Sequence, residues 1–168
     1  MTTSESLFFR DGKPFDFLRD RILPELLATR RASRRLRFWS AGTATGQEAY
    51  SIAMLLADLD PRPAGWSFEI VATDYSRAVL ERARAGRYNH FEVQRGLPAH
   101  YLSRYFTPVD GGWQIADRIR RAVQFREGNL LEPFDDLGTF DVIFCRNVLI
   151  YIEASARRGV IERLAGAL

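Results

Sequence analysis

The sequence predicts an α/β domain with a mainly parallel sheet and a small inserted hairpin. Four apolar runs of strand character alternate with stretches of helical spacing, which favours parallel strands joined by crossover helices. An Asp-Gly-Gly turn at residues 110–112, flanked by short apolar runs, is typical of an antiparallel hairpin. The chain has 168 residues, of which 46% are hydrophobic and 27% charged, so we expect one globular domain over residues 1–168.

Residues 1–35 predict a helical lead-in to the sheet. Apolar side chains recur at helical spacing between residues 14 and 29, and Pro24 is expected to kink or split this helix. Strand and helix then alternate, with Ser76 suited to cap a helix that stops at Gly86. The predicted ranges are a strand at 36–41, a helix at 47–59, a loop at 60–65 and a strand at 66–74.

Residues 88–122 predict the inserted subdomain, which contains a helix near 98–104 and the hairpin. A third strand follows at 123–126. The fourth, at 140–145, is almost continuously apolar, as expected for a strand buried on both faces. A helix from residue 154 to 168 closes the chain.

Composition limits the classes of partner and compartment. No apolar run approaches the roughly 20 residues of a membrane span, and no signal peptide is recognisable, so we expect a cytoplasmic protein without membrane insertion. The single cysteine, Cys145, excludes an intramolecular disulfide and a cysteine zinc site. Arginine clusters at 30–37 and 117–121 are either solvated helix ends or surfaces for phosphates or an acidic protein.

A glycine-containing loop separates the first strand from its helix. Gly42 and Gly46 permit either a tight turn alone or close approach of a ligand to backbone amides at the helix start. Neither a P-loop nor a complete G-x-G-x-x-G is present. Glu48, in the first helical turn, either favours the helix dipole or holds an ammonium group.

Asp74 ends the second strand, where an acid either caps the next helix or accepts hydrogen bonds from a ribose diol. The loop and the acid together favour a ligand that carries an adenosine. A dinucleotide would require a true phosphate loop, whereas S-adenosylmethionine has no phosphate and fits this looser turn better.

Polar groups also follow the third and fourth strands. Asn129 follows the third strand, and Arg146, Asn147 and Tyr151 follow the fourth, in the stretch "CRNVLIY". This stretch lacks the Pro-Pro-aromatic motif of enzymes that methylate nucleic-acid amino groups, and its donors suit an anionic acceptor such as a carboxylate. The structural alternatives are a strand end for Arg146 and Asn147 and a packed aromatic for Tyr151.

Several stretches together resemble the chemotaxis receptor glutamate methyltransferases, the CheR family. They are "SESLFFRDGKPF", "FWSAGTATGQEAYSIAMLLAD", "VATDYSRAVLERARAGRY", "VQFREGNLL" and "FDVIFCRNVLIYIE", in the order of the family and over nearly the whole chain. The resemblance implies a Rossmann-like class I methyltransferase sheet. It also implies methyl transfer from S-adenosyl-L-methionine to glutamate carboxylates on chemoreceptor cytoplasmic helices, with no nucleic-acid partner.

The resemblance also assigns site residues. Tyr151 and Arg146 are expected to act in catalysis. Ser4 and Ser6 stand where many members have Asn and Thr, and "GQEAYS" replaces the common "GEEPYS" but keeps Glu48. The expected cofactor-binding residues are Ser4, Ser6, Arg10, Gly42, Gly46, Glu48, Asp74, Asn129, Leu130, Cys145, Arg146 and Asn147.

The resemblance further implies that the sheet is incomplete at its C-terminal end, because four of about seven expected strands are present and no N-terminal helical domain precedes them. An unpaired fourth strand would be an association hazard, so a homodimer through this edge is one hypothesis. The alternative function is a non-catalytic S-adenosylmethionine-binding regulatory or scaffold module. Nucleic-acid methylation is a third, weaker interpretation that rests on the arginine clusters.

Overall fold

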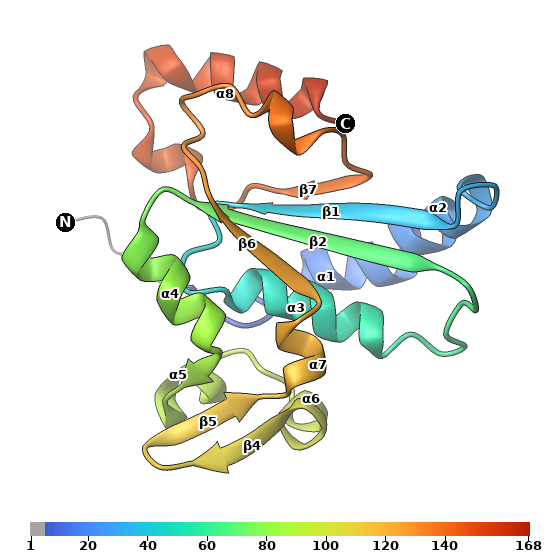
Figure 1. The fold of residues 1–168 in the computed structure, drawn as a ribbon, viewed down its shortest axis with the longest axis vertical. Coiled ribbons are helices and arrows are strands. Elements are labelled where there is room, and N and C mark those ends of the chain that lie inside the picture. The colour runs from blue at the N-terminus through green and yellow to red at the C-terminus, as the bar shows by residue number, and fades with distance from the viewer. Residues whose placement is uncertain (1–5) are drawn as a thin grey trace.

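The computed structural model describes residues 6–168, and within this range four parallel strands form the main sheet (Figure 1). The strand order is β6-β2-β1-β7. β1 lies in register with β2 from the pair Arg35–Ser67 to the pair Ala41–Thr73. The bounds are β1 Arg35–Ala41, β2 Ser67–Asp74, β6 Val123–Glu127 and β7 Val142–Phe144. The direction of winding reverses between β1 and β7, which is where doubly wound sheets bind ligands.

Alternation along the strands builds a core on each face of this sheet. Phe38 and Ile70 point into the larger core, together with α3 (Gln47–Ala57) and the N-terminal helices. Their neighbours Trp39 and Val71 point into the smaller core, where α8 (Ala154–Gly166) contributes part of the cover. α4 (Arg77–Ala85) connects β2 to the subdomain (Figure 1). The α/β prediction is therefore confirmed.

The N-terminal helix changes from α- to π-helical winding just before the predicted proline and returns to α-helix at Leu23. α1 (Lys13–Phe17) runs into a π-helical turn, η1 (Leu18–Ile22), and then into α2 (Leu23–Thr29) with Pro24 in its first turn. A proline lacks the N–H that an α-helical interior requires, so it is tolerated where a new helical segment begins.

The inserted segment forms a second, antiparallel sheet of order β3-β5-β4 below the main one (Figure 1). The expected hairpin is present, and β3 adds a strand that the sequence did not predict. Tyr88 of β3 donates a hydrogen bond from its hydroxyl to the Thr45 carbonyl (2.7 Å), which ties this sheet to the loop after β1. The bounds are β3 Arg87–Tyr88, α5 His90–Gln94, α6 Ala99–Tyr105, β4 Phe106–Val109, β5 Gly112–Ile115 and α7 Asp117–Arg120.

The fourth strand departs from the prediction. Only Val142–Phe144 form β7, and all three are half-buried, so burial on both faces was wrong. The reason is position: β7 pairs with β1 alone, and no other strand of residues 6–168 lies along its far side. Short 3₁₀ turns, η2 (Asp135–Leu137) and η3 (Leu149–Tyr151), flank it. Over the described residues, no helix has the length and apolar character to cross a bilayer.

The arginine clusters are engaged with acids of the same chain. Glu69 pairs with Arg35 (2.5 Å) and Arg37 (2.9 Å). The Asp117 carboxylate pairs with Arg120 at 2.9 Å. These contacts give structural roles to part of each cluster.

Candidate active site

A cavity of about 470 Å³ lies beyond the carboxyl ends of the four parallel strands, at the reversal between β1 and β7. Most residues predicted to bind a ligand line it, although they come from segments far apart in the chain. Those lining it are Ser6, Arg10, Gly42, Glu48, Asp74, Asn129, Leu130, Arg146, Asn147 and Tyr151. Ser4 lies outside the described residues. Gly46 and Cys145 are not among the lining residues.

The loop after β1 needs a glycine at its first position. Gly42 has φ of +73°, and a Cβ added there would lie 2.4 Å from Cγ2 of Val148. Its N–H donates to the Thr73 carbonyl (2.9 Å), which holds the loop against the end of β2. The absence of a side chain therefore lets the segment after β7 approach the floor of the cavity.

Gly46 has a packing role behind the cavity. It precedes α3 with φ of +94°, and an added Cβ would lie 3.1 Å from Ala83 and 3.3 Å from the rings of Tyr50 and Phe125. Its predicted contact with a ligand stays a prediction.

Both oxygens of the Asp74 carboxylate are fixed by backbone amides. Oδ2 accepts a hydrogen bond from the Ala44 N–H (2.9 Å), and Oδ1 accepts one from the Ser76 N–H (3.0 Å). Ser76, as predicted, caps α4 by accepting from the Val79 N–H. Each carboxylate oxygen retains a lone pair, so a held Asp74 can still accept hydrogen bonds from a diol.

Glu48 is a buried acid with an unusual protonation equilibrium. The Ser40 hydroxyl donates to Oε1 (2.8 Å), and Arg146 Nη1 lies 3.7 Å from Oε2. Burial raises the pKa of the Glu48 carboxyl to about 7, although Ser40 and the charges of Arg146 and Arg10 oppose this shift. A cationic ligand group beside Glu48 would favour the ionised carboxylate and so lower this pKa.

Arg146 links the end of β7 to the N-terminal strap, which we define as residues 6–12. Its Nη2 donates to the Arg10 carbonyl (3.0 Å) and to the Asp11 carboxylate (2.6 Å). Nη1 is buried without a hydrogen-bond acceptor in the described part of the chain. The Arg146 guanidinium is therefore a buried part of the cavity lining. Tyr151, on η3, also lines the cavity, but its side chain is 54% exposed.

Cys145 packs against the smaller core instead of facing the cavity. Burial, together with the Glu48 charge, raises the pKa of its thiol to about 11, so it is protonated at neutral pH. No group of three metal-ligating side chains occurs within residues 6–168.

The sequence reasoning missed several lining residues. Thr43 is buried, and its Oγ1 has no hydrogen-bond partner among the described residues, which leaves a polar atom to be satisfied by a ligand or water. Tyr75 and Leu131 add exposed apolar surface beside Asp74 and Leu130. Each of these residues adjoins a predicted one, which was the signal available.

Comparison with known proteins identifies the family. The model described as CheR methyltransferase, SAM binding domain, matches residues 4–168. Chemotaxis protein methyltransferase 1 of Pseudomonas aeruginosa is 43% identical over 172 residues, which cover 100% of this chain and 62% of the relative. The chemotaxis protein methyltransferase of Escherichia coli is 37% identical over 174 residues, with 100% and 57% covered.

The chain thus spans about three fifths of the length of the relatives it matches. Among solved structures, the glycopeptide N-methyltransferase MtfA has a TM-score of 0.48 and 15% identity, over 86% of this chain and 50% of that one. That likeness is too distant to add to the assignment. The match over residues 4–168 and the identity to the chemotaxis enzymes show that the chain belongs to the CheR methyltransferase family and carries its S-adenosylmethionine-binding domain.

Proposed function

We propose that this chain is the catalytic domain of a cytoplasmic methyltransferase that forms glutamate methyl esters on chemoreceptors. The observation that carries the proposal is a single cavity that combines two fixed acids, Glu48 and Asp74, with an exposed tyrosine, in a chain of the CheR family. The relatives are named as chemotaxis protein methyltransferases, which supports the same pathway here.

The residues of the cavity fit S-adenosylmethionine. Glu48 is suited to the ammonium group of the cofactor, and the free Thr43 Oγ1 adds an acceptor or donor in the same loop. Asp74 is suited to the ribose diol because its oxygens are already oriented by amides. Asn129 and Leu130, after β6, would border the adenine. The volume of about 470 Å³ lies in the usual range for cofactor sites.

The cofactor, when bound, supplies a methyl group on a sulfonium sulfur. A glutamate acceptor, with a reference pKa of about 4.3, is already ionised at neutral pH and needs no general base. This agrees with the lining, because neither His90 nor His100 contributes to the cavity. The protein would act by positioning, which contributes up to roughly 7 kcal/mol or more in favourable cases.

Tyr151 and Arg146 would have different roles toward the acceptor carboxylate. Tyr151 lines the cavity and is exposed, and its hydroxyl would donate to the acceptor carboxylate. Arg146 is held by Asp11 and Glu48, so it would contribute positive potential while fixing the strap. This assigns to Arg146 a more structural role than the resemblance alone implied.

The test is transfer of labelled methyl groups to a purified chemoreceptor cytoplasmic fragment. We expect incorporation that alkali releases as methanol, because carboxylate esters hydrolyse in base. A fragment with its methylated glutamates replaced by alanine is the matched acceptor control. Calorimetry with S-adenosylhomocysteine should give binding that Asp74→Ala removes, while Asp110→Asn at the exposed hairpin tip should retain it. Binding without any methyl transfer would refute catalysis and favour the scaffold alternative.

A further inference from the structure

The Arg146 guanidinium is shared unequally between the strap and the cofactor cavity. Its Nη2 donates two hydrogen bonds to the strap, one to the Asp11 carboxylate (2.6 Å) and one to the Arg10 carbonyl (3.0 Å). Its Nη1 lies 3.7 Å from Oε2 of Glu48, beyond hydrogen-bond distance, and meets no acceptor within residues 6–168. A buried donor is therefore left unpaired beside a buried carboxylate.

This arrangement leaves a stronger pairing unused. A buried donor without an acceptor is unfavourable, and a hydrogen bond between a guanidinium and a carboxylate is among the strongest in proteins. A movement of about 1 Å would bring Nη1 of Arg146 to the usual distance of such a bond with Glu48. The two contacts of Nη2 with the strap hold the guanidinium back from that position.

The strap positions Asp11 through contacts of its own. Phe8 is fully buried against Tyr88, with ring centroids 4.9 Å apart, and the Phe9 N–H donates to the Ser51 hydroxyl (2.9 Å). Asp11 has φ of +66°, a conformation that aspartate and asparagine tolerate better than most residues. The path of the strap is therefore fixed by contacts other than the ion pair.

Stability alone is a poor explanation for the pair between Asp11 and Arg146. The Asp11 side chain is 68% exposed, and ion pairs that are open to solvent contribute little to the free energy of folding. The Arg146 side chain is only 18% exposed. The main consequence of the pair is the position in which it holds this buried cation.

Charged and titratable groups face Glu48 from several elements. Arg10 belongs to the strap, Arg146 and Cys145 follow β7, and the Ser40 hydroxyl of β1 donates to Oε1 (2.8 Å). Although both arginines oppose the shift, burial raises the pKa of the Glu48 carboxyl to about 7. Direct hydrogen bonding to the guanidinium would favour the ionised carboxylate further and would occupy one of its oxygens.

We propose that Asp11 is a positioning residue, which holds the Arg146 guanidinium toward the strap and so reserves the Glu48 carboxylate for a cationic ligand group. The inference rests on the proposed function, in which this group is the ammonium of S-adenosylmethionine. Without the Asp11 charge, Arg146 pairs with Glu48 and competes with that ammonium.

The first test is the titration of Glu48 in the ligand-free protein, followed by carbon NMR of labelled glutamate carboxyls. Glu48→Gln assigns the signal. In Asp11→Asn the midpoint should lie at a pH about 1 lower than in the wild type, as expected when an opposite charge comes into contact. Asp16→Asn makes the same charge change on α1, where the acid pairs with Arg19, and should leave the midpoint unchanged.

A second background separates positioning from the loss of a nearby negative charge. Removing that charge lowers the Glu48 midpoint by itself, with or without Arg146. Positioning acts only through the guanidinium, so Asp11→Asn added to Arg146→Met should leave the midpoint of Arg146→Met unchanged. An unchanged midpoint in Asp11→Asn alone, or an equal fall in both backgrounds, would overturn the proposal.

Ligand affinity gives an independent measurement. If only the ionised and unpaired Glu48 binds the ammonium well, a midpoint lowered by about 1 predicts weaker binding by about twofold at about pH 6, fivefold at about pH 7 and ninefold at about pH 8. Calorimetry of Asp11→Asn with S-adenosylhomocysteine should show this increase, and a loss that is constant over the three pH values would overturn the proposal. Failure of the wild type to bind would instead refute the proposed function, and the ligand-free titration would still decide the role of Asp11.

Discussion

The clearest consequence of the cofactor cavity is that ligand binding should depend on pH through Glu48. The folded protein without ligand holds this carboxyl with a pKa of about 7, because burial disfavours the charged form. An ammonium group beside it favours the ionised form, so binding of S-adenosylhomocysteine should release a proton. The affinity should therefore rise as the pH is raised through about 7.

The magnitude follows from the fraction of Glu48 that is ionised. With a pKa of about 7, roughly a tenth is ionised at about pH 6 and roughly nine tenths at about pH 8. If only the ionised form binds the ammonium well, the affinity should increase about tenfold over this interval. About half a proton should be released per ligand bound at about pH 7.

The assay is calorimetric titration at three pH values, in buffers of different ionisation enthalpy, so that the released protons are counted directly. The Glu48→Gln variant keeps a polar group next to Ser40 but cannot titrate, and its affinity should be weaker and nearly independent of pH. A wild-type affinity that stays level between about pH 6 and pH 8 would refute the assignment of Glu48 to the ammonium group. So would an equal pH dependence in the variant.

Four further results are expected. Chemical denaturation should show wild-type stability falling as pH rises from about 4.5 to about 7, because the folded state keeps a proton on Glu48 that the unfolded state releases; the advantage of Glu48→Gln should grow by up to about 3 kcal/mol over that window, and a constant difference would contradict the raised pKa of Glu48. Gly42→Ala should cost more stability than Gly111→Ala, since both have positive φ but only Gly42 faces Val148; thermal melts giving equal losses would argue against that contact. Tyr151→Phe should leave S-adenosylhomocysteine binding unchanged and slow methyl transfer by roughly ten- to a hundredfold, the worth of a hydrogen bond to a charged group; wild-type turnover would remove the tyrosine from the mechanism. If the β7 edge pairs two copies, sedimentation at micromolar concentration should detect a dimer, and a monomer would dismiss that hypothesis.

Local signals predicted the features that depend on near neighbours in the chain. The alternation in β1 and β2 placed Phe38 and Trp39 on opposite faces, and Ser76 and Gly86 marked the limits of α4. The polar residues after each strand converge on one cavity because parallel strands share one carboxyl edge. Most of the candidate site could therefore be predicted without coordinates.

Features that depend on contacts between residues far apart in the chain could not be predicted from the sequence. β7 is short because its length is set by pairing with β1, which composition does not encode. The strap has positive φ at Phe9 and Asp11, and its path is fixed by the Ser51 hydroxyl, which accepts from the Phe9 N–H (2.9 Å). The anchoring of Arg146 by Asp11, 135 residues away, likewise appears only in the folded chain.

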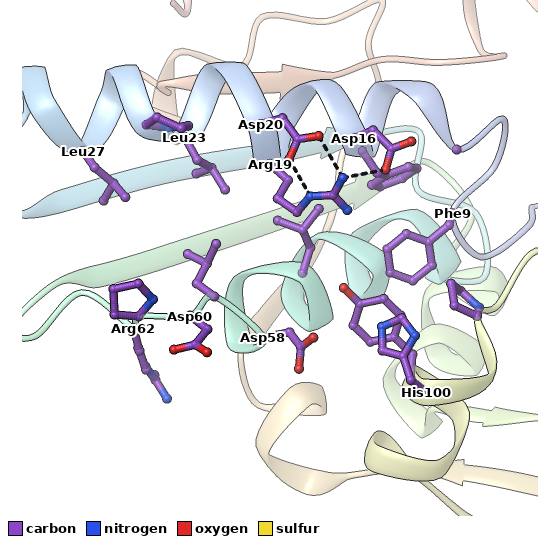
Figure 2. A pocket seen from close by; sticks show the side chains of 18 of the residues that line it. Phe9, Asp16, Arg19, Asp20, Leu23, Leu27, Asp58, Asp60, Arg62 and His100 are labelled. Atoms are coloured by element: carbon purple, nitrogen blue, oxygen red, sulfur yellow. Dashed lines mark hydrogen bonds and ion pairs between the residues drawn. The ribbon is translucent and has the colours of Figure 1, made fainter.

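The strap also contributes neighbouring residues to two different cavities. Arg10 lines the cofactor cavity, and the preceding residue, Phe9, lines a second cavity of about 880 Å³ between the N-terminal helix and the loop after α3 (Figure 2). If a ligand in one cavity displaces the strap, the lining of the other cavity changes as well. Thermodynamic reciprocity then sets a quantitative rule: by whatever factor an occupant of the second cavity alters the affinity for S-adenosylhomocysteine, S-adenosylhomocysteine must alter the affinity for that occupant by the same factor.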